Sequence, residues 1–184
     1  MRVFVAIDLD PGLKKTVREF VEVVRKTGAA VRWVDSGGMH LTLKFLGEID
    51  PRTVPSVEEE IRRASALSRR FPLVLEGTGC FPGGRRPRVL WIGIREEPAL
   101  GDLHKRLDEG LARLGFVQEE RPFHAHLTIG RVKGPGGLSG VLGELEKSRT
   151  ALFGTMAVEK VTLFQSILRP AGAEYRVVTE FDLP

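Results

Sequence analysis

Hydrophobic residues follow two different spacings in this chain, and the two alternate from one end to the other. Short runs rich in β-branched residues alternate with segments in which apolar residues recur every three or four positions. The first spacing predicts β-strands, and the second predicts amphipathic helices. Strands are predicted at 2–9, 30–34, 40–47, 72–81, 88–94, 123–132, 156–168 and 174–183, and helices at 13–28, 50–68, 100–115 and 138–147.

The order of these elements predicts the fold class. Strands come in adjacent pairs with helices between them, which is typical of an α+β fold with largely antiparallel sheets. A chain of 184 residues with 42% hydrophobic content is large enough for one domain with a proper core. We therefore expect residues 1–184 to form a single domain, or two small lobes that share one core.

Composition restricts the setting in which the protein works. Cys80 is the single cysteine, so no intramolecular disulfide forms, and no cysteine or histidine cluster indicates a structural zinc. The N-terminus lacks the pattern of a secretory signal, and no apolar run is long enough to cross a membrane. We expect a cytoplasmic protein. A net charge of +4 permits an RNA partner but is also compatible with none.

One short pattern occurs twice, as "HLTL" at 40–43 and "HLTI" at 126–129. On a strand, side chains alternate between the two faces, so each histidine shares a face with its threonine while the apolar residues point the other way. A single copy would be read most simply as a strand with one face in water. Two matching copies, in a chain with only four histidines, favour a shared functional site.

Two imidazoles and two hydroxyls facing a common space suit phosphodiester cleavage. His40 and His126 are the candidate catalytic residues, because one neutral imidazole can accept a proton while the other, protonated, donates one. Thr42 and Thr128 can donate hydrogen bonds to phosphate oxygens. Arg131 could add a cation, although it needs a bulge near Gly130 to reach the same face. This chemistry requires no metal and no cofactor.

The remaining candidates are weaker. His124 and His126 have a spacing that also suits a metal site, which leaves a metal-dependent phosphoesterase as an alternative. No matching Asp or Glu stands nearby, so His124 is expected at the edge of the site, and His104 is expected on the surface. Candidate RNA contacts are Arg85, Arg86, Arg88, Phe45 and His124, the three arginines forming a basic loop that could equally be an ordinary solvated hairpin.

The paired motifs, together with "RVFVAIDL", "RVLWIGI" and "LFQSILRPAGAEY", resemble the two-histidine (2H) phosphoesterase superfamily, and within it the RNA 2′,3′-cyclic phosphodiesterases of bacteria and archaea, historically called 2′-5′ RNA ligases. The resemblance implies a bilobal fold with a pseudo-twofold axis, a central cleft that holds the site, and no metal. It implies hydrolysis of a 2′,3′-cyclic phosphate at an RNA end to a 2′-phosphate.

By the same resemblance, His40 would protonate the departing 3′ oxygen and His126 would activate water, although the sequence alone allows the reverse. The reverse reaction would join RNA ends. Ala125 stands where the family usually has proline, a change that removes no functional group. The expected partner is RNA with a cyclic phosphate end, tRNA fragments being one candidate source, and we expect a monomer without a membrane or an obligate protein partner. An RNA-end-binding or ligating module with little turnover is the other alternative.

Overall fold

The computed structural model describes residues 1–84, 86–169 and 172–184. Its strands are β1 (Arg2–Asp8), β2 (Val31–Trp33), β3 (His40–Glu48), β4 (Phe71–Phe81), β5 (Val89–Ile94), β6 (His126–Val132), β7 (Leu152–Val158), β8 (Lys160–Arg169) and β9 (Gly172–Asp182). Its helices are α1 (Pro11–Arg25), α2 (Val54–Ala66), α3 (Pro98–Ala112) and α4 (Leu138–Lys147), with short 3-10 turns at Ser36–Gly38 and Pro51–Thr53.

The strands form two antiparallel sheets, which confirms the predicted α+β class. Sheet A has the order β3-β1-β8-β9, and sheet B has the order β2-β6-β5-β4-β7. Both sheets combine strands from early and late parts of the chain. The chain therefore passes between the two sheets several times, and it places the two histidine motifs on different sheets.

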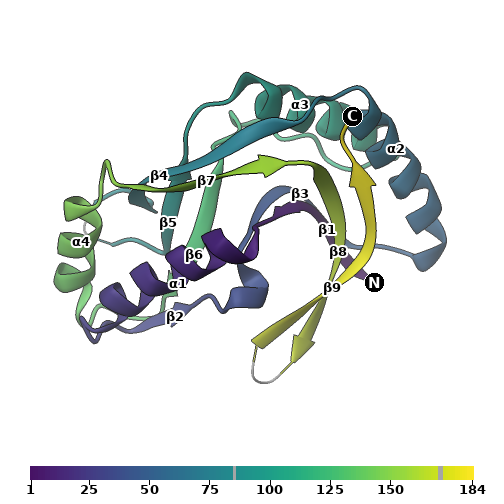
Figure 1. The fold of residues 1–184 in the computed structure, drawn as a ribbon. Helices are drawn as coiled ribbons and strands as arrows, with labels where there is room; N and C mark the ends of the chain where they lie inside the picture. The colour runs from purple at the N-terminus through teal and green to yellow at the C-terminus, as the bar shows by residue number, and fades with distance from the viewer. Residues whose placement is uncertain (85, 170–171) are drawn as a thin grey trace.

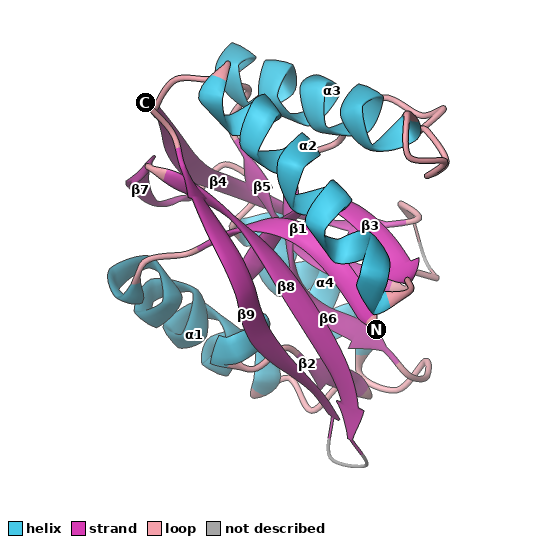
Figure 2. Ribbon diagram, turned by 90° about the vertical axis from the view of Figure 1, so that its right-hand side faces the viewer, coloured by secondary structure: helices cyan, strands magenta, loops and turns pink. Residues whose placement is uncertain are grey.

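The helices form the outer layers of the molecule. Helices α2 and α3 pack on each other and on strands of sheet A, whereas α1 and α4 pack on each other and on strands of sheet B. Figure 1 shows these two pairs on opposite sides of the strands, and Figure 2 shows α2 and α3 beside sheet A. Local sequence starts the helices: before α1, the Asp10 carboxylate accepts a hydrogen bond of 2.7 Å from the Leu13 N–H.

Strand β1 shows how side chains divide between the two faces of sheet A. Val3, Val5 and Ile7 enter the main hydrophobic core, which continues through the strands of sheet B. Phe4 and Ala6 point to the other face, where they form a small separate cluster with Phe164 of β8 and the partly buried Tyr175 of β9. This second face of sheet A carries the first histidine motif.

Two predicted strands differ from the observed ones. The segment 156–168, predicted as one strand, breaks at Glu159 into β7 and β8, which belong to different sheets. The segment 123–132 becomes a strand only at His126. Sequence spacing does not reveal a crossing between sheets, because both parts keep an apolar face. In the described part of the chain, no helix has the length and apolar character needed to cross a membrane.

Candidate active site

The first motif lies at the start of β3, which pairs with β1. His40 lies opposite Asp8 and Thr42 lies opposite Ala6, so both share the face that carries the Phe4 cluster. Leu41 and Leu43 are buried in the main core, as the alternation predicted. The register with β1 skips Leu43, and this bulge reverses the alternation beyond it.

The bulge at Leu43 assigns the next two side chains to opposite faces. Phe45 lies opposite Phe4, with 5.8 Å between ring centroids, and is 62% exposed on the motif face. Lys44 points into the protein and is 4% exposed. Phe45 can therefore offer an exposed ring near His40, whereas Lys44 cannot contact a substrate on that face.

His40 is enclosed by aromatic rings. Its centroid lies 4.7 Å from that of Phe4, 5.0 Å from that of Tyr175 and 5.6 Å from that of Phe164. The Nδ1 atom is buried and lacks a hydrogen-bond partner of normal geometry among the described residues. Because burial disfavours the charged ring, the pKa of His40 falls from 6.5 to about 4.

Charged neighbours modify this effect of burial. Asp8 raises the pKa of His40, but Lys14 lowers it, and the backbone of Gly37 raises it again. The Lys14 Nζ atom lies 2.8 Å from Oδ2 of Asp8, so the two charges largely cancel near the imidazole. In the free protein, His40 is therefore neutral at pH 7.

The second motif lies at the start of β6, between β2 and β5. His126 lies opposite Gly93 and Thr128 lies opposite Trp91, while Leu127 and Ile129 are fully buried. The His126 Nδ1 atom lies 2.7 Å from the His124 carbonyl oxygen. A carbonyl can only accept, so Nδ1 must carry the proton, and Nε2 of the neutral ring is left with its lone pair.

The pKa of His126 is also lowered, first by burial. The hydrogen bond to the His124 carbonyl raises it, whereas the charges of His124 and Arg131 lower it. Phe81 stands edge-on to His126, with centroids 5.1 Å apart and an interplanar angle of 84°. Each candidate histidine therefore has an aromatic neighbour that partly removes it from water.

A bulge in β6 turns Arg131 toward the motif face. Trp91 pairs with Thr128 and Leu90 pairs with Gly130, so Ile129 is the extra residue. Beyond this bulge, Arg131 lies on the same face as Thr128. The bulge stands next to Gly130, where the sequence suggested one. Arg131 is exposed, and its charge lowers the pKa of His126.

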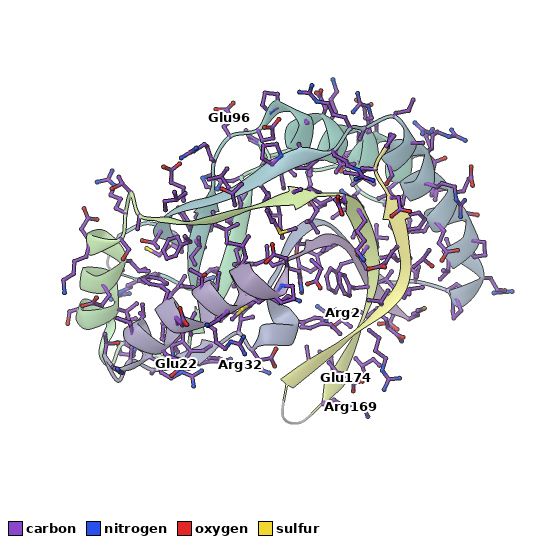
Figure 3. The ribbon with its side chains drawn as sticks, in the orientation of Figure 1. Arg2, Glu22, Arg32, Glu96, Arg169 and Glu174 are labelled. Atoms are coloured by element: carbon purple, nitrogen blue, oxygen red, sulfur yellow. The ribbon has the colours of Figure 1, made fainter. Side chains whose placement is uncertain are left out.

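Arg32 is a residue that the sequence analysis missed. It lies on β2 directly opposite Arg131, and both are exposed. Figure 3 shows Arg32 at the edge of the molecule beside β2. Like charges at directly opposed positions disfavour a sheet, so an anion bound beside either side chain would relieve their repulsion. Arg32 and Arg131 become neighbours only through the pairing of β2 with β6, so their spacing in the sequence does not reveal it.

Three of the other candidate RNA contacts, Arg86, Arg88 and His124, lie at the surface. Arg85 lies outside the described residues, while Arg86 and Arg88 are exposed. The Arg88 N–H donates to the Phe81 carbonyl at 2.7 Å, which holds this loop at the end of β4. His124 is exposed and contacts Phe81 and Trp91 at centroid distances of 5.2 and 5.5 Å.

His104 was expected on the surface, and this expectation is wrong. It is only 8% exposed and stacks on Phe123 with 3.9 Å between centroids and an angle of 12°. Burial lowers its pKa, although the nearby Asp108 raises it. The leucines around His104 turn the helix face inward, and the aromatic partner comes from a distant loop.

The donor set for a metal is small. The rings of His124 and His126 are 6.2 Å apart, and Nδ1 of His126 already bonds to a carbonyl. Among the residues described by the structure, no group of three or more His, Cys, Asp and Glu side chains is placed to hold a metal ion. The alternative based on these two histidines therefore lacks further ligands within the described residues.

The two motifs belong to different sheets, but their strands, β3 and β6, contact each other. Two surface hollows lie elsewhere, one of about 220 Å³ beside α2 and one of about 250 Å³ between the residues that follow α2 and helix α3, and none of the motif residues lines them. The arrangement on β3 and β6 provides two partly buried imidazoles, two hydroxyls and a nearby arginine, which is a set suited to acid–base chemistry on an anionic ester.

Comparisons with known proteins agree on one family. The profile of the 2′-5′ RNA ligase superfamily matches residues 13–167. The chain is 34% identical to an RNA 2′,3′-cyclic phosphodiesterase of Methanothermobacter thermautotrophicus, covering 100% of this chain and 99% of that protein. It is 36% identical to the Archaeoglobus fulgidus protein of the same name, covering 99% of this chain and 100% of that one.

Solved structures show the same fold. A crystal structure of a Thermus thermophilus protein matches with a TM-score of 0.83 and 30% identity, covering 100% of this chain and 98% of that one. The crystal structure of Escherichia coli LigT complexed with 3′-AMP matches with a TM-score of 0.77 and 27% identity, covering 99% and 97% of the two chains.

Proposed function

The chain belongs to the 2′-5′ RNA ligase superfamily, and from this membership we propose that it hydrolyses the 2′,3′-cyclic phosphodiester at an RNA end to a 2′-phosphomonoester. Relatives that match over nearly the whole chain carry the name RNA 2′,3′-cyclic phosphodiesterase. The observation that carries the proposal is the placement of two His-x-Thr motifs at the starts of two contacting strands, β3 and β6.

In the proposed reaction, a water oxygen bonds to phosphorus while the bond from phosphorus to the 3′ oxygen breaks. Nε2 of His126 takes the proton from the water, and His40 gives a proton to the departing 3′ oxygen. The single product keeps the phosphate on the 2′ oxygen and carries a hydroxyl at the 3′ position. Return of both histidines to their starting protonation states requires only exchange with solvent, so the proton balance closes without a metal ion.

The hydrogen bonding of His126 supports its role as the base. Its Nδ1–H points to the His124 carbonyl at 2.7 Å, so the Nε2 lone pair is free for the proton of water. The same hydrogen bond raises the pKa of His126 and strengthens it as a base.

His40 can act as the acid only with substrate bound. In the free protein burial holds its pKa near 4, so the ring carries no proton to donate at pH 7. Binding of the anionic phosphate beside it would raise this pKa and supply the charge that stabilises the imidazolium. The rings of Phe4 and Phe164, which lie at 33° and 25° to the His40 ring, add a favourable environment for that cation.

Three further residues would hold the phosphate. The hydroxyls of Thr42 and Thr128 share faces with the two histidines and would donate to its non-bridging oxygens. Arg131 would supply a positive charge at the same place, because the bulge in β6 turns it to the face of Thr128. Arg32, directly opposite, would extend this charge toward the next phosphate of the RNA.

Substrates with sulfur in place of the 3′ oxygen test the two roles. Sulfur leaves without protonation, so a variant that lacks only the acid regains turnover on this substrate, whereas a variant that lacks the base does not. We expect rescue of His40→Ala and none of His126→Ala, with the 2′-phosphate as the product on the normal substrate. A 3′-phosphate product, or rescue of His126→Ala alone, would reverse the assignment.

The reverse reaction at this site would join a cyclic phosphate end to a 5′-hydroxyl, with hydrolysis dominant in water. We place the protein in the cytoplasm as a monomer, with tRNA fragments as one source of substrate. A protein that binds RNA ends without turnover would bind the substrate and form no product, which a binding measurement with the same RNA, made beside the turnover assay, would show.

A further inference from the structure

A buried ion pair links the strand of the first motif to helix α3. Nζ of Lys44 lies 2.5 Å from Oδ1 of Asp108, and the two side chains are 3% and 11% exposed. The same ammonium donates to the backbone carbonyl of Val117 at 2.5 Å. Lys44 follows Thr42 by only two positions, on the inner face created by the Leu43 bulge.

The carboxylate of Asp108 also holds backbone. Its Oδ2 and Oδ1 atoms accept from the Glu119 N–H at 3.3 and 3.4 Å. Together, Lys44 and Asp108 therefore fix a carbonyl and an N–H of the segment 113–125, which runs from α3 to β6 without helix or strand of its own. Such a segment is otherwise free to move.

The end of this segment has a second attachment to α3. His104, one helical turn before Asp108, stacks on Phe123 at 3.9 Å between centroids. The next residue is His124, whose carbonyl binds Nδ1 of His126. The last residues of segment 113–125 therefore include the His124 carbonyl, which orients the ring of His126.

We propose that Lys44 and Asp108 are positioning residues for His126: they hold segment 113–125 so that the His124 carbonyl fixes the orientation of the His126 ring. This inference rests on the proposed hydrolase function. It joins the two motifs physically, since Lys44 belongs to the strand of His40 and acts on the approach to His126.

Stability alone is a weak reason for this pair. Removing two charges from water costs several kcal/mol each, and replacing a buried ion pair by apolar residues of similar size is often neutral or stabilising. The pair instead supplies hydrogen bonds to two backbone groups, the Val117 carbonyl and the Glu119 N–H, which apolar side chains cannot make. The double variant Lys44→Met with Asp108→Leu separates these two roles, because it leaves no buried charge unpaired.

We expect the double variant to stay folded, with kcat for the cyclic phosphate reduced about tenfold or more and KM changed much less, because catalytic groups tolerate little misplacement. The pKa of His126, followed by NMR, should be lower in the double variant than in the wild type. The reason is that the variant weakens the hydrogen bond to the His124 carbonyl, which raises this pKa. A purely structural pair would change the melting temperature and leave kcat and the His126 titration as in the wild type.

Arg113→Met is the matched control. It removes another ion pair at the end of α3, in which Arg113 contacts Glu60 at 2.6 Å. Arg113 stands at the start of the attached segment, but its partner belongs to α2, so kcat and the His126 titration should remain those of the wild type. Phe123→Leu removes the stacking on His104 and should also lower kcat. This variant keeps the test valid if the double variant does not fold.

Two failures are distinguishable. A wild-type protein without turnover contradicts the proposed function, and the His126 titration of the variants then still tests the positioning role. A wild-type protein that hydrolyses the substrate, together with a double variant or Phe123→Leu of unchanged kcat and unchanged His126 titration, overturns the inference itself.

Discussion

The burial of His40 predicts a specific dependence of folding stability on pH. The folded chain binds a proton at His40 only near pH 4, whereas the unfolded chain binds it near pH 6.5. Between these values, the unfolded state holds more protons, so stability falls as the pH falls through this window. The contribution is complete above pH 6.5 and lost below about pH 4.

The magnitude follows from the two pKa values of His40. Each pKa unit corresponds to about 1.4 kcal/mol, so the difference between 6.5 and about 4 amounts to roughly 3 kcal/mol of unfolding free energy. Other groups, including His104 and His126, also titrate here, so the wild type alone cannot isolate the effect. A His40→Gln variant keeps a polar side chain of similar size, removes this titration and leaves the others in place.

Urea unfolding at a series of pH values from about 7.5 to about 4 measures the effect. We expect the wild type to lose about 3 kcal/mol more than His40→Gln over this range, because only the wild type must protonate a buried imidazole. The absolute stabilities of the two proteins do not enter, since only their change with pH is compared. Parallel curves for the two proteins would refute the desolvation of His40.

Three further variants test other parts of the structure. Arg32→Gln should raise KM about tenfold for an oligonucleotide with a cyclic phosphate end and leave KM for a cyclic mononucleotide unchanged, since it removes one charged contact to a neighbouring phosphate. Thr128→Val should lower kcat about a hundredfold, with little change in melting temperature, because it removes one donor to the phosphate. Gly79→Ala should destabilise the protein by about 2 kcal/mol in thermal unfolding, because a Cβ would lie 2.3 Å from the Trp91 ring.

The sequence predicted those parts of the fold and site that depend on local periodicity. The alternation of 40–43 and 126–129 places His40 and His126 on the polar face of each strand, and the structure confirms the buried partners. The resemblance to the family is likewise confirmed by its matching profile. These features are set by residues close together in the chain, which is where spacing carries information.

What the sequence did not reveal depends on pairing between distant segments. Phe4 and Tyr175 reach His40 only through the register of β1, β8 and β9, and Asp108 reaches Lys44 across 64 positions. The bulge at Leu43 turned Lys44 inward, against simple alternation. The burial of His104 has the same origin, since its partner Phe123 comes from the segment before β6.

Hydrolysis of a short RNA ending in a 2′,3′-cyclic phosphate, in the presence of EDTA, tests the central claim most directly. The wild type is compared with His40→Ala and His126→Ala, each checked for folding by thermal unfolding. We expect turnover to a 2′-phosphate by the wild type and loss of at least about a hundredfold in each variant. Undiminished turnover by either variant, or wild-type activity that requires an added divalent metal, would contradict the two-histidine mechanism.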